Sequence, residues 1–221
     1  VALMARHSGS PVKTFSMGFE EASHDELQYA RAVARRYGTE HHEKTVRPQS
    51  VDLLPTLVAA YDDPFADSSA IPTYMVSKFA REHVTVVLSG DGGDELFAGY
   101  KVYNKIRRLN RWNKVPSSLR EAVWGNVHRL LPEKMVGKGL SYYLSLPPDS
   151  LQASFGIWTA QERRLLYVED FRRVLGGRAS EQHKENLGRL ASGGDWVARA
   201  QEVDMRTYLV DDIFTKVDRV S

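Results

Sequence analysis

Along the first half of the chain, segments with the hydrophobic spacing of a strand alternate with segments that have the spacing of a helix. Residues 12–19 combine β-branched and aromatic side chains behind a Ser-Gly-Ser-Pro turn, which predicts a strand. An amphipathic helix follows, with Ser23 and Glu26 as a capping box at its start and Gly38 placed to end it. Residues 39–46 show a weaker strand pattern. The segment therefore predicts a strand, a helix and a second strand in succession.

The same alternation continues to residue 88. Residues 48–61 predict a helix despite Pro55, and residues 70–81 predict another. Residues 84–88 then form an uninterrupted apolar run, which is the pattern of a strand buried on both faces. Strands that alternate with helices predict an α/β fold with a parallel sheet and right-handed crossovers. Ligands of such sheets bind beyond the carboxyl ends of the strands, and the loop that starts at residue 89 lies at such an end.

The second half of the chain has helical periodicity and little strand signal. The clearest examples are residues 119–131 and 195–209. We expect a mainly helical lobe here, with a boundary near residues 105–115.

Composition narrows the class of protein. The chain has 221 residues, of which 42% are hydrophobic, and a formal net charge of +2, so it predicts a globular protein without a strong bulk attraction to nucleic acid or membrane. It has no cysteine, which excludes disulfides and thiolate zinc sites here and fits a reducing cytoplasm. We see no run long enough to span a bilayer and no signal peptide. Residues 1–6 read as the end of a helix and residues 211–221 stop without a terminator, so we expect a fragment.

The loop Ser89–Glu95, Ser-Gly-Asp-Gly-Gly-Asp-Glu, crowds three glycines and three acids into seven positions. Glycines let a backbone approach phosphate closely, whereas carboxylates repel it. A magnesium ion between the two would resolve the conflict, because this hard cation takes oxygens from both. The alternative is a tight turn in which Asp94 and Glu95 favour the start of the next helix. The loop is not a Walker A motif, since no lysine and Ser/Thr follow the glycines.

Five ordered motifs resemble one known family. "TFSMGFEE", "GTEHHE", "DDPFADSSAIPTY", "VVLSGDGGDELFAGY" and "YLVDDIFTKVDRVS" are similar to the ATP-dependent synthetase domain of class B, glutamine-hydrolysing asparagine synthetases. The resemblance covers residues 1–105 and 205–221. It implies a doubly wound parallel sheet of the adenine-nucleotide hydrolase (PP-loop ATPase) type, followed by the mainly helical lobe. The implied division is residues 1–110 for the nucleotide-binding α/β part and 111–221 for the helical part of one synthetase domain.

The resemblance also implies roles for individual residues. The backbone of Met17 would lie beside adenine, and Ser89 and Gly90 would contact the nucleotide. Asp91 stands where many members have Glu, at a position linked to formation of the acyl-adenylate. ATP and Mg²⁺ are the implied substrate and metal.

Two further residues match the family's reacting centre. Asp94 matches its magnesium ligand, and Lys216 in "TKVDR" matches a lysine that neutralises charge on phosphate. Without the motif, Lys216 reads as a solvated lysine or as the partner of neighbouring acids, and Met17 reads as a core residue of a strand.

Other polar residues have simpler explanations. His41 and His42 are adjacent, so a strand would direct them to opposite faces, and we expect both to be structural. Asp62, Asp63 and Asp67 flank Pro64-Phe65 in a loop, where turn formation and helix capping account for most of the pattern, with a lining of the acceptor pocket as the second interpretation. The basic residues between 101 and 114 suit a solvated helix face better than a nucleic-acid surface.

The family's first phosphate loop, Ser-Gly-Gly-x-Asp-Ser, and its glutaminase domain would lie before Val1. We therefore expect residues 1–221 alone to be inactive in asparagine synthesis. The expected partners are aspartate and ammonia from that glutaminase domain, without nucleic acid or membrane, and a homodimer stays open. No residue of the motifs specifies aspartate, so two alternatives remain: a related adenylating ligase of the β-lactam synthetase or peptide macrocyclase type, or a non-catalytic nucleotide-binding domain.

Overall fold

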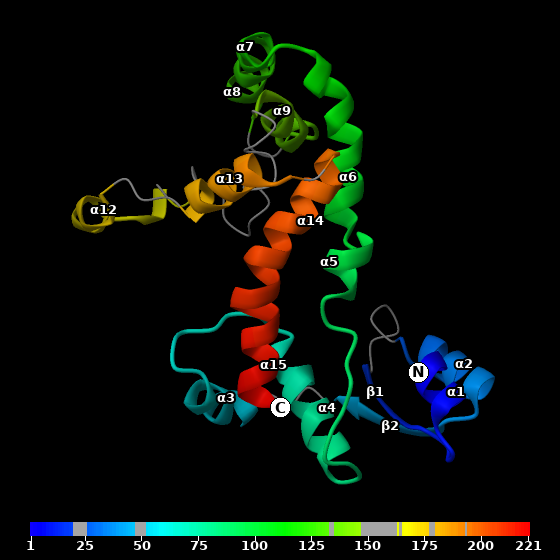
Figure 1. Ribbon diagram of the computed structural model, residues 1–221. Coiled ribbons are helices and arrows are strands. Elements are labelled where there is room, and N and C mark those ends of the chain that lie inside the picture. Colours follow the sequence, from blue (N-terminus) through cyan, green and yellow to red (C-terminus); the bar gives the residue numbers. More distant parts are fainter. Residues whose placement is uncertain are drawn as a thin grey trace. The chain divides into compact units, whose positions relative to one another are not determined.

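The computed structural model describes residues 1–19, 26–46, 52–132, 135–146, 163, 165–176, 180–192 and 194–221. The chain divides into two compact units (Figure 1). Unit 1 comprises residues 1–90 and 212–221, and unit 2 comprises residues 91–211. The last residues of the chain thus belong to the same unit as the first. The division of the synthetase domain at residue 110 stays a prediction.

The centre of unit 1 is a parallel pair of strands, β1 (Lys13–Phe19) and β2 (Glu40–Val46). Helix α1 (Ala2–His7) precedes β1, and α2 (Leu27–Tyr37) connects the two strands. Gly38 adopts φ 60° and ends α2, as predicted, because a left-handed residue at this position costs glycine little. The predicted strand–helix–strand succession is confirmed, whereas Ser23 of the capping box lies outside the described residues.

The described part of unit 1 also contains the helices α3 (Leu54–Ala60), α4 (Ala70–Arg81) and α15 (Thr215–Val220) (Figure 1). Helix α4 packs on the strand pair, and α15 packs on α3 and α4. The predicted helix at residues 70–81 is therefore confirmed. The start of the helix predicted at residue 48 lies outside the described residues, and its remainder is α3.

The prediction of a buried strand at residues 84–88 is wrong. The segment has no regular secondary structure, and its apolar side chains are largely exposed, with Val86 at 79% and Leu88 at 74%. A strand forms where its backbone groups pair with those of another strand, and the sheet in the described residues consists of β1 and β2 without this segment. The described architecture is a mainly helical α/β fold with a small parallel sheet.

Unit 2 is helical over its described residues, as predicted. Its elements include α5 (Gly93–Phe97), α6 (Lys101–Leu109), the 3₁₀-helix η2 (Asn110–Lys114), α7 (Ser117–Arg120), the π-helix η3 (Glu121–Gly125), α8 (Asn126–Leu130), α9 (Lys138–Ser145), α12 (Glu169–Leu175), α13 (Ser180–Leu190) and α14 (Trp196–Arg206). The π-helix η4 (Leu209–Phe214) then leads into α15.

The core of unit 2 forms where α6, α9 and α14 meet. Among the described residues, its buried members are Tyr103, Ile106, Leu109, Leu144 and Ala200. Figure 1 shows α14 alongside α6, and the hydroxyl of Tyr103 donates to Asp204 Oδ2 at 2.8 Å between these two helices. Asp195 caps α14 by accepting from two backbone N–H groups at 2.8 Å.

No helix in the described part of the chain is long and apolar enough to cross a bilayer.

Candidate active site

The glycine-rich loop changes direction at Gly92. This residue is buried, adopts φ 84° and directly precedes α5. An L side chain rarely adopts this backbone conformation, so the position requires glycine. Ser89, Gly90 and Asp91 are exposed. The loop therefore presents accessible backbone and carboxylate groups on a turn that its glycine permits.

Asp94, in the first turn of α5, has an exposed carboxylate. Its side chain lies against the backbone of Gly99, where a Cβ would come within 1.8 Å of Asp94 Oδ1. The backbone N–H of Gly99 also donates to the carbonyl of Asp94 at 3.0 Å. Gly99 therefore leaves the space that the Asp94 carboxylate occupies, a role that the sequence analysis did not assign to it.

The Asp94 carboxylate is a suitable ligand for a magnesium ion. No group of three or more His, Cys, Asp or Glu residues in the described ranges could hold a metal by itself. Mg²⁺ is typically bound by one or two carboxylates together with substrate phosphates and water, rather than by an all-protein cage. An accessible carboxylate on a glycine-rich loop fits that pattern.

Glu95, the next residue, is fully buried and plays a different part. The hydroxyl of Tyr100 donates to Glu95 Oε1 at 2.8 Å, and Gln201 Nε2 donates to the Glu95 carbonyl at 2.6 Å. Burial and the adjacent Glu95 carboxylate raise the pKa of Tyr100, which keeps its hydroxyl protonated as a donor. The Glu95 carbonyl thus anchors the end of the loop to α14, while Glu95 Oε2 is buried without a hydrogen-bond partner among the described residues.

Lys216 on α15 is buried, with 8% of its surface exposed. Its ammonium donates to Asp67 Oδ2 at 2.8 Å and to Ser69 Oγ at 2.6 Å. Ser69 in turn donates to both Asp67 oxygens, from its hydroxyl at 2.6 Å and from its backbone N–H at 2.9 Å. The lysine is therefore not solvated. Its ion-pair partner among the described residues is Asp67, 149 residues away, and its charge also lowers the pKa of Asp212, although other causes outweigh this effect.

The charges in this cluster interact strongly. Burial by itself raises the pKa of Asp67, but hydrogen bonds from Lys216 and Ser69 outweigh burial and lower that pKa to about 2. Burial and the negative charge of Asp67 raise the pKa of Asp212. Asp212 Oδ1 and the hydroxyl of Tyr61 are buried and have no hydrogen-bond partner among the described residues. The cluster therefore holds the Lys216 ammonium beside two aspartates, of which Asp67 has a lowered pKa and Asp212 a raised pKa.

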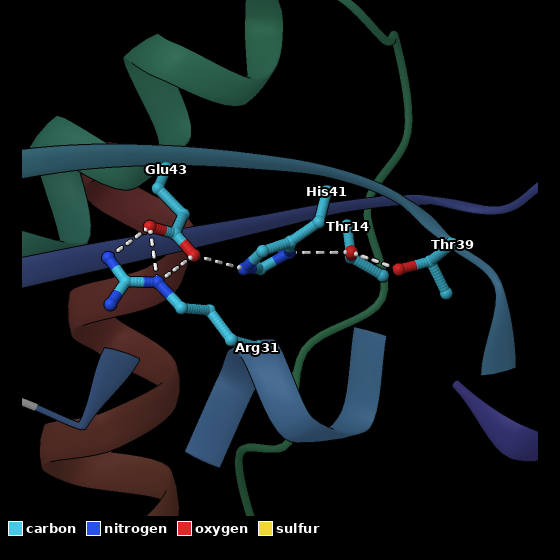
Figure 2. Close-up of polar contacts among 5 residues, drawn as sticks. All are labelled: Thr14, Arg31, Thr39, His41 and Glu43. Carbon is cyan, nitrogen blue, oxygen red and sulfur yellow. Dashed lines mark hydrogen bonds and ion pairs between the residues drawn. The ribbon is translucent and has the colours of Figure 1, made fainter. Parts of the chain in front are cut away.

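A second polar network lies on the strand pair (Figure 2). His41 Nδ1 is 2.8 Å from Thr14 Oγ1, which is 2.9 Å from Thr39 Oγ1. On its other side, His41 Nε2 lies 3.1 Å from Glu43 Oε1. Arg31 of α2 donates to both oxygens of Glu43, and this contact is the main cause that lowers the pKa of Glu43. The network joins α2 to one face of the strands.

His42 faces the opposite side of the sheet, as the alternation of a strand predicted. Its ring stacks on Phe15 with 5.2 Å between centroids and on His83 at 4.4 Å, close to Phe79 of α4. Both histidines are thus part of the packing that holds α2 and α4 on the two faces.

The predicted site residues fall in both units. Met17 is half-buried on β1, paired in register with Lys44, and belongs to unit 1 with Ser89, Gly90 and Lys216. Asp91 and Asp94 belong to unit 2. Within the described part of unit 1, no hydrogen bond or ion pair joins Lys216 to Met17, Ser89 or Gly90, whereas Asp67 and Ser69 are brought to Lys216.

The sequence matches the family described as asparagine synthase over residues 1–221. It is 31% identical over 231 residues to asparagine synthetase [glutamine-hydrolyzing] 1 of Bacillus subtilis, covering 100% of this chain and 34% of the relative. It is 36% identical over 230 residues to a putative asparagine synthetase [glutamine-hydrolyzing] of Mycobacterium tuberculosis, covering 100% of this chain and 33% of the relative. The chain thus spans about a third of the length of these relatives. No solved structure is significantly similar to it.

Proposed function

Because the chain belongs to the asparagine synthase family, we propose that it forms the ATP-dependent part of a glutamine-hydrolysing asparagine synthetase. The match to such synthetases along the whole chain carries the proposal. The full protein would join an amino group to the side-chain carboxylate of aspartate, with ammonia delivered from a glutaminase domain. This makes it a carbon–nitrogen ligase that forms AMP and pyrophosphate.

The reaction has two balanced steps. An oxygen of the aspartate side-chain carboxylate attacks the α-phosphorus of ATP, and the bond from that phosphorus to pyrophosphate breaks. Ammonia then attacks the acyl carbon of the resulting aspartyl-adenylate, loses a proton, and AMP leaves as the carbon–oxygen bond breaks. Both steps place negative charge on oxygens around the reacting centre, so positioned donors and cations lower the barriers.

We assign nucleotide binding to Met17, Ser89 and Gly90. Met17 would offer its strand backbone to adenine, and Ser89 with Gly90 would offer exposed backbone and hydroxyl groups to the nucleotide. Asp91 would orient the groups that form the acyl-adenylate, with a side chain one methylene shorter than the Glu of many relatives. The fold assigned to this chemistry is the doubly wound sheet of the PP-loop ATPase type.

Asp94 would hold Mg²⁺, which neutralises phosphate charge when bound. The accessible carboxylate supports this assignment, as does the space that Gly99 leaves for it.

Lys216 would stabilise negative charge on the reacting carboxylate and phosphate. Its ammonium is held by two acceptors, so little reorganisation is needed during the reaction, and burial strengthens its field relative to water. The low pKa of Asp67 keeps a negative partner beside the lysine at neutral pH.

Exchange between ATP and pyrophosphate tests the proposal, because it reports the first step alone. The complete protein is incubated with ATP, Mg²⁺, labelled pyrophosphate and one carboxylate at a time, and asparagine and AMP are measured after ammonium chloride is added. Exchange that depends on aspartate, followed by asparagine formation, is the expected result. Exchange with another carboxylate but not with aspartate would overturn the assigned substrate, and exchange with none would overturn adenylation.

A further inference from the structure

We propose that Asp67 and Ser69 are positioning residues that fix the direction of the Lys216 ammonium, a proposal that rests on the proposed role of Lys216. An ammonium has three N–H donors. Two of them are committed to Asp67 Oδ2 and Ser69 Oγ, at 2.8 Å and 2.6 Å. The remaining donor has no protein partner among the described residues, so its direction is set by the other two.

The hydroxyl of Ser69 supports a role beyond local structure. Ser69 precedes α4 at the N-cap, where a serine side chain normally accepts from a backbone N–H of the first turn. Here it makes no such hydrogen bond. The hydroxyl instead donates to Asp67 and accepts from Lys216. The hydroxyl of Ser69 is therefore committed to Asp67 and Lys216 and not to the backbone of α4.

Asp67 is itself held rigidly. Its two oxygens accept from the backbone and the hydroxyl of Ser69, so the carboxylate cannot rotate without losing both bonds. A rigid acceptor fixes a flexible lysine stem better than solvent does, because each bond restricts a different torsion. Stability alone does not require an ion pair at this place, since apolar residues of similar volume often stabilise a fold as much as a buried ion pair does.

The same two segments are joined by a second ion pair that serves as a control. Arg219 on α15 lies 2.5 Å from Asp62, and the side chains are 44% and 74% exposed. This pair links α15 to the loop after α3, as Lys216 and Asp67 do, but it does not touch Lys216. If Asp67 only tethered α15, then loss of Asp62 should resemble a mild loss of Asp67.

A double-mutant cycle on the complete protein separates positioning from tethering. The variants are Asp67→Asn, Ser69→Ala, Lys216→Ala, Asp67→Asn with Lys216→Ala, and the control Asp62→Asn. Turnover in aspartate-dependent ATP–pyrophosphate exchange, the KM for ATP and the melting temperature are measured for each. Ser69→Ala keeps the charged pair intact, so it remains informative if Asp67→Asn does not fold.

We expect Asp67→Asn to lower turnover about 10²-fold, the size typical for loss of an oriented donor, while the KM for ATP changes less than about threefold. Ser69→Ala should lower turnover about tenfold, and Asp62→Asn should stay within about twofold of the unaltered protein. In the Lys216→Ala background, Asp67→Asn should have no further effect on turnover, because the group through which it acts is gone.

Each other outcome overturns a distinct statement. Losses that multiply in the double variant, or turnover unaffected by both Asp67→Asn and Ser69→Ala while Lys216→Ala is impaired, would overturn positioning and leave the proposed function standing. Full turnover in Lys216→Ala would overturn the role of the lysine and positioning with it. Absence of exchange with aspartate in the unaltered protein would overturn the proposed function, and the cycle would then be judged on whichever carboxylate supports exchange.

Discussion

The Asp94 carboxylate fills the space that a side chain on Gly99 would need: a Cβ built on Gly99 would lie 1.8 Å from Asp94 Oδ1 and 2.9 Å from Asp94 Cγ. The carboxylate can keep its place only because residue 99 has no side chain. The backbone N–H of Gly99, bonded to the Asp94 carbonyl, keeps the two residues together.

Gly99→Ala should therefore turn the Asp94 side chain away and weaken magnesium-dependent adenylation, with a loss of stability of only about 1 kcal/mol because a side chain can rotate. AMP formation measured across a magnesium titration checks this. Gly93→Ala is the matched control: a Cβ there meets nothing within 4 Å, and activity should be retained. Equal effects of the two substitutions would contradict the steric explanation.

Asp94→Asn should sharply lower adenylation while the fold stays intact. The amide removes the negative charge that a divalent cation requires but keeps the shape of the side chain. The magnesium concentration for half-maximal activity should rise, and circular dichroism should be unchanged. Activity identical to that of the unaltered protein at every magnesium concentration would rule the assignment out.

Lys216→Ala should lower turnover about 10²- to 10³-fold and weaken nucleotide binding much less. Lys216→Arg should be a poor substitute, because Asp67 and Ser69 are arranged around a compact ammonium and a planar guanidinium presents its donors differently. Steady-state kinetics and equilibrium binding of ATP separate the two effects. Turnover of the alanine variant within about twofold, less than 1 kcal/mol of barrier, would make the lysine structural.

Stability should fall in acid through Asp67. Its pKa is lowered from an ordinary 3.8 to about 2 in the fold, so the carboxylate contributes stability above pH 3.8 that is lost as the pH falls towards 2. The contribution is about 2 kcal/mol. The difference in melting temperature between the unaltered protein and Asp67→Asn should therefore be largest at neutral pH and shrink below pH 4. A difference independent of pH would show that charge is not its source.

Asp212→Asn should act with the opposite sign. The fold raises the pKa of Asp212, so the ionised carboxylate costs stability at neutral pH, and a neutral amide removes that cost. The melting temperature should be equal or higher at pH 7, and the gain should vanish in acid, where the unaltered Asp212 is protonated. A clear decrease at pH 7 would mean that the ionised form is required.

The sequence patterns correctly predicted those features of the fold that depend on residues close together in the chain. The two strands, the helix at residues 70–81 and the end of α2 at Gly38 follow from periodicity and backbone preference within a few residues. The strand predicted at residues 84–88 is not formed. An apolar run becomes a strand only where another strand pairs with it, and the run itself does not reveal such a partner.

The surroundings of Lys216 could not be derived in this way. The motif identified the lysine, but Asp67 lies 149 residues away and was interpreted mainly as a turn residue. The one available signal was the serine two positions after it, a residue suited to a helix cap. Only the tertiary structure shows that this serine is used elsewhere.

The register of the strand pair limits how sequences of this kind can vary. Thr14 pairs with His41, and Phe15 pairs with His42, so polar and aromatic contacts occupy opposite faces. An insertion or deletion of one residue within β1 or β2 would exchange those faces at once, placing imidazole and hydroxyl groups where aromatic rings pack. Changes in length among relatives should therefore accumulate in the connections around α2, and those inside either strand should come in pairs.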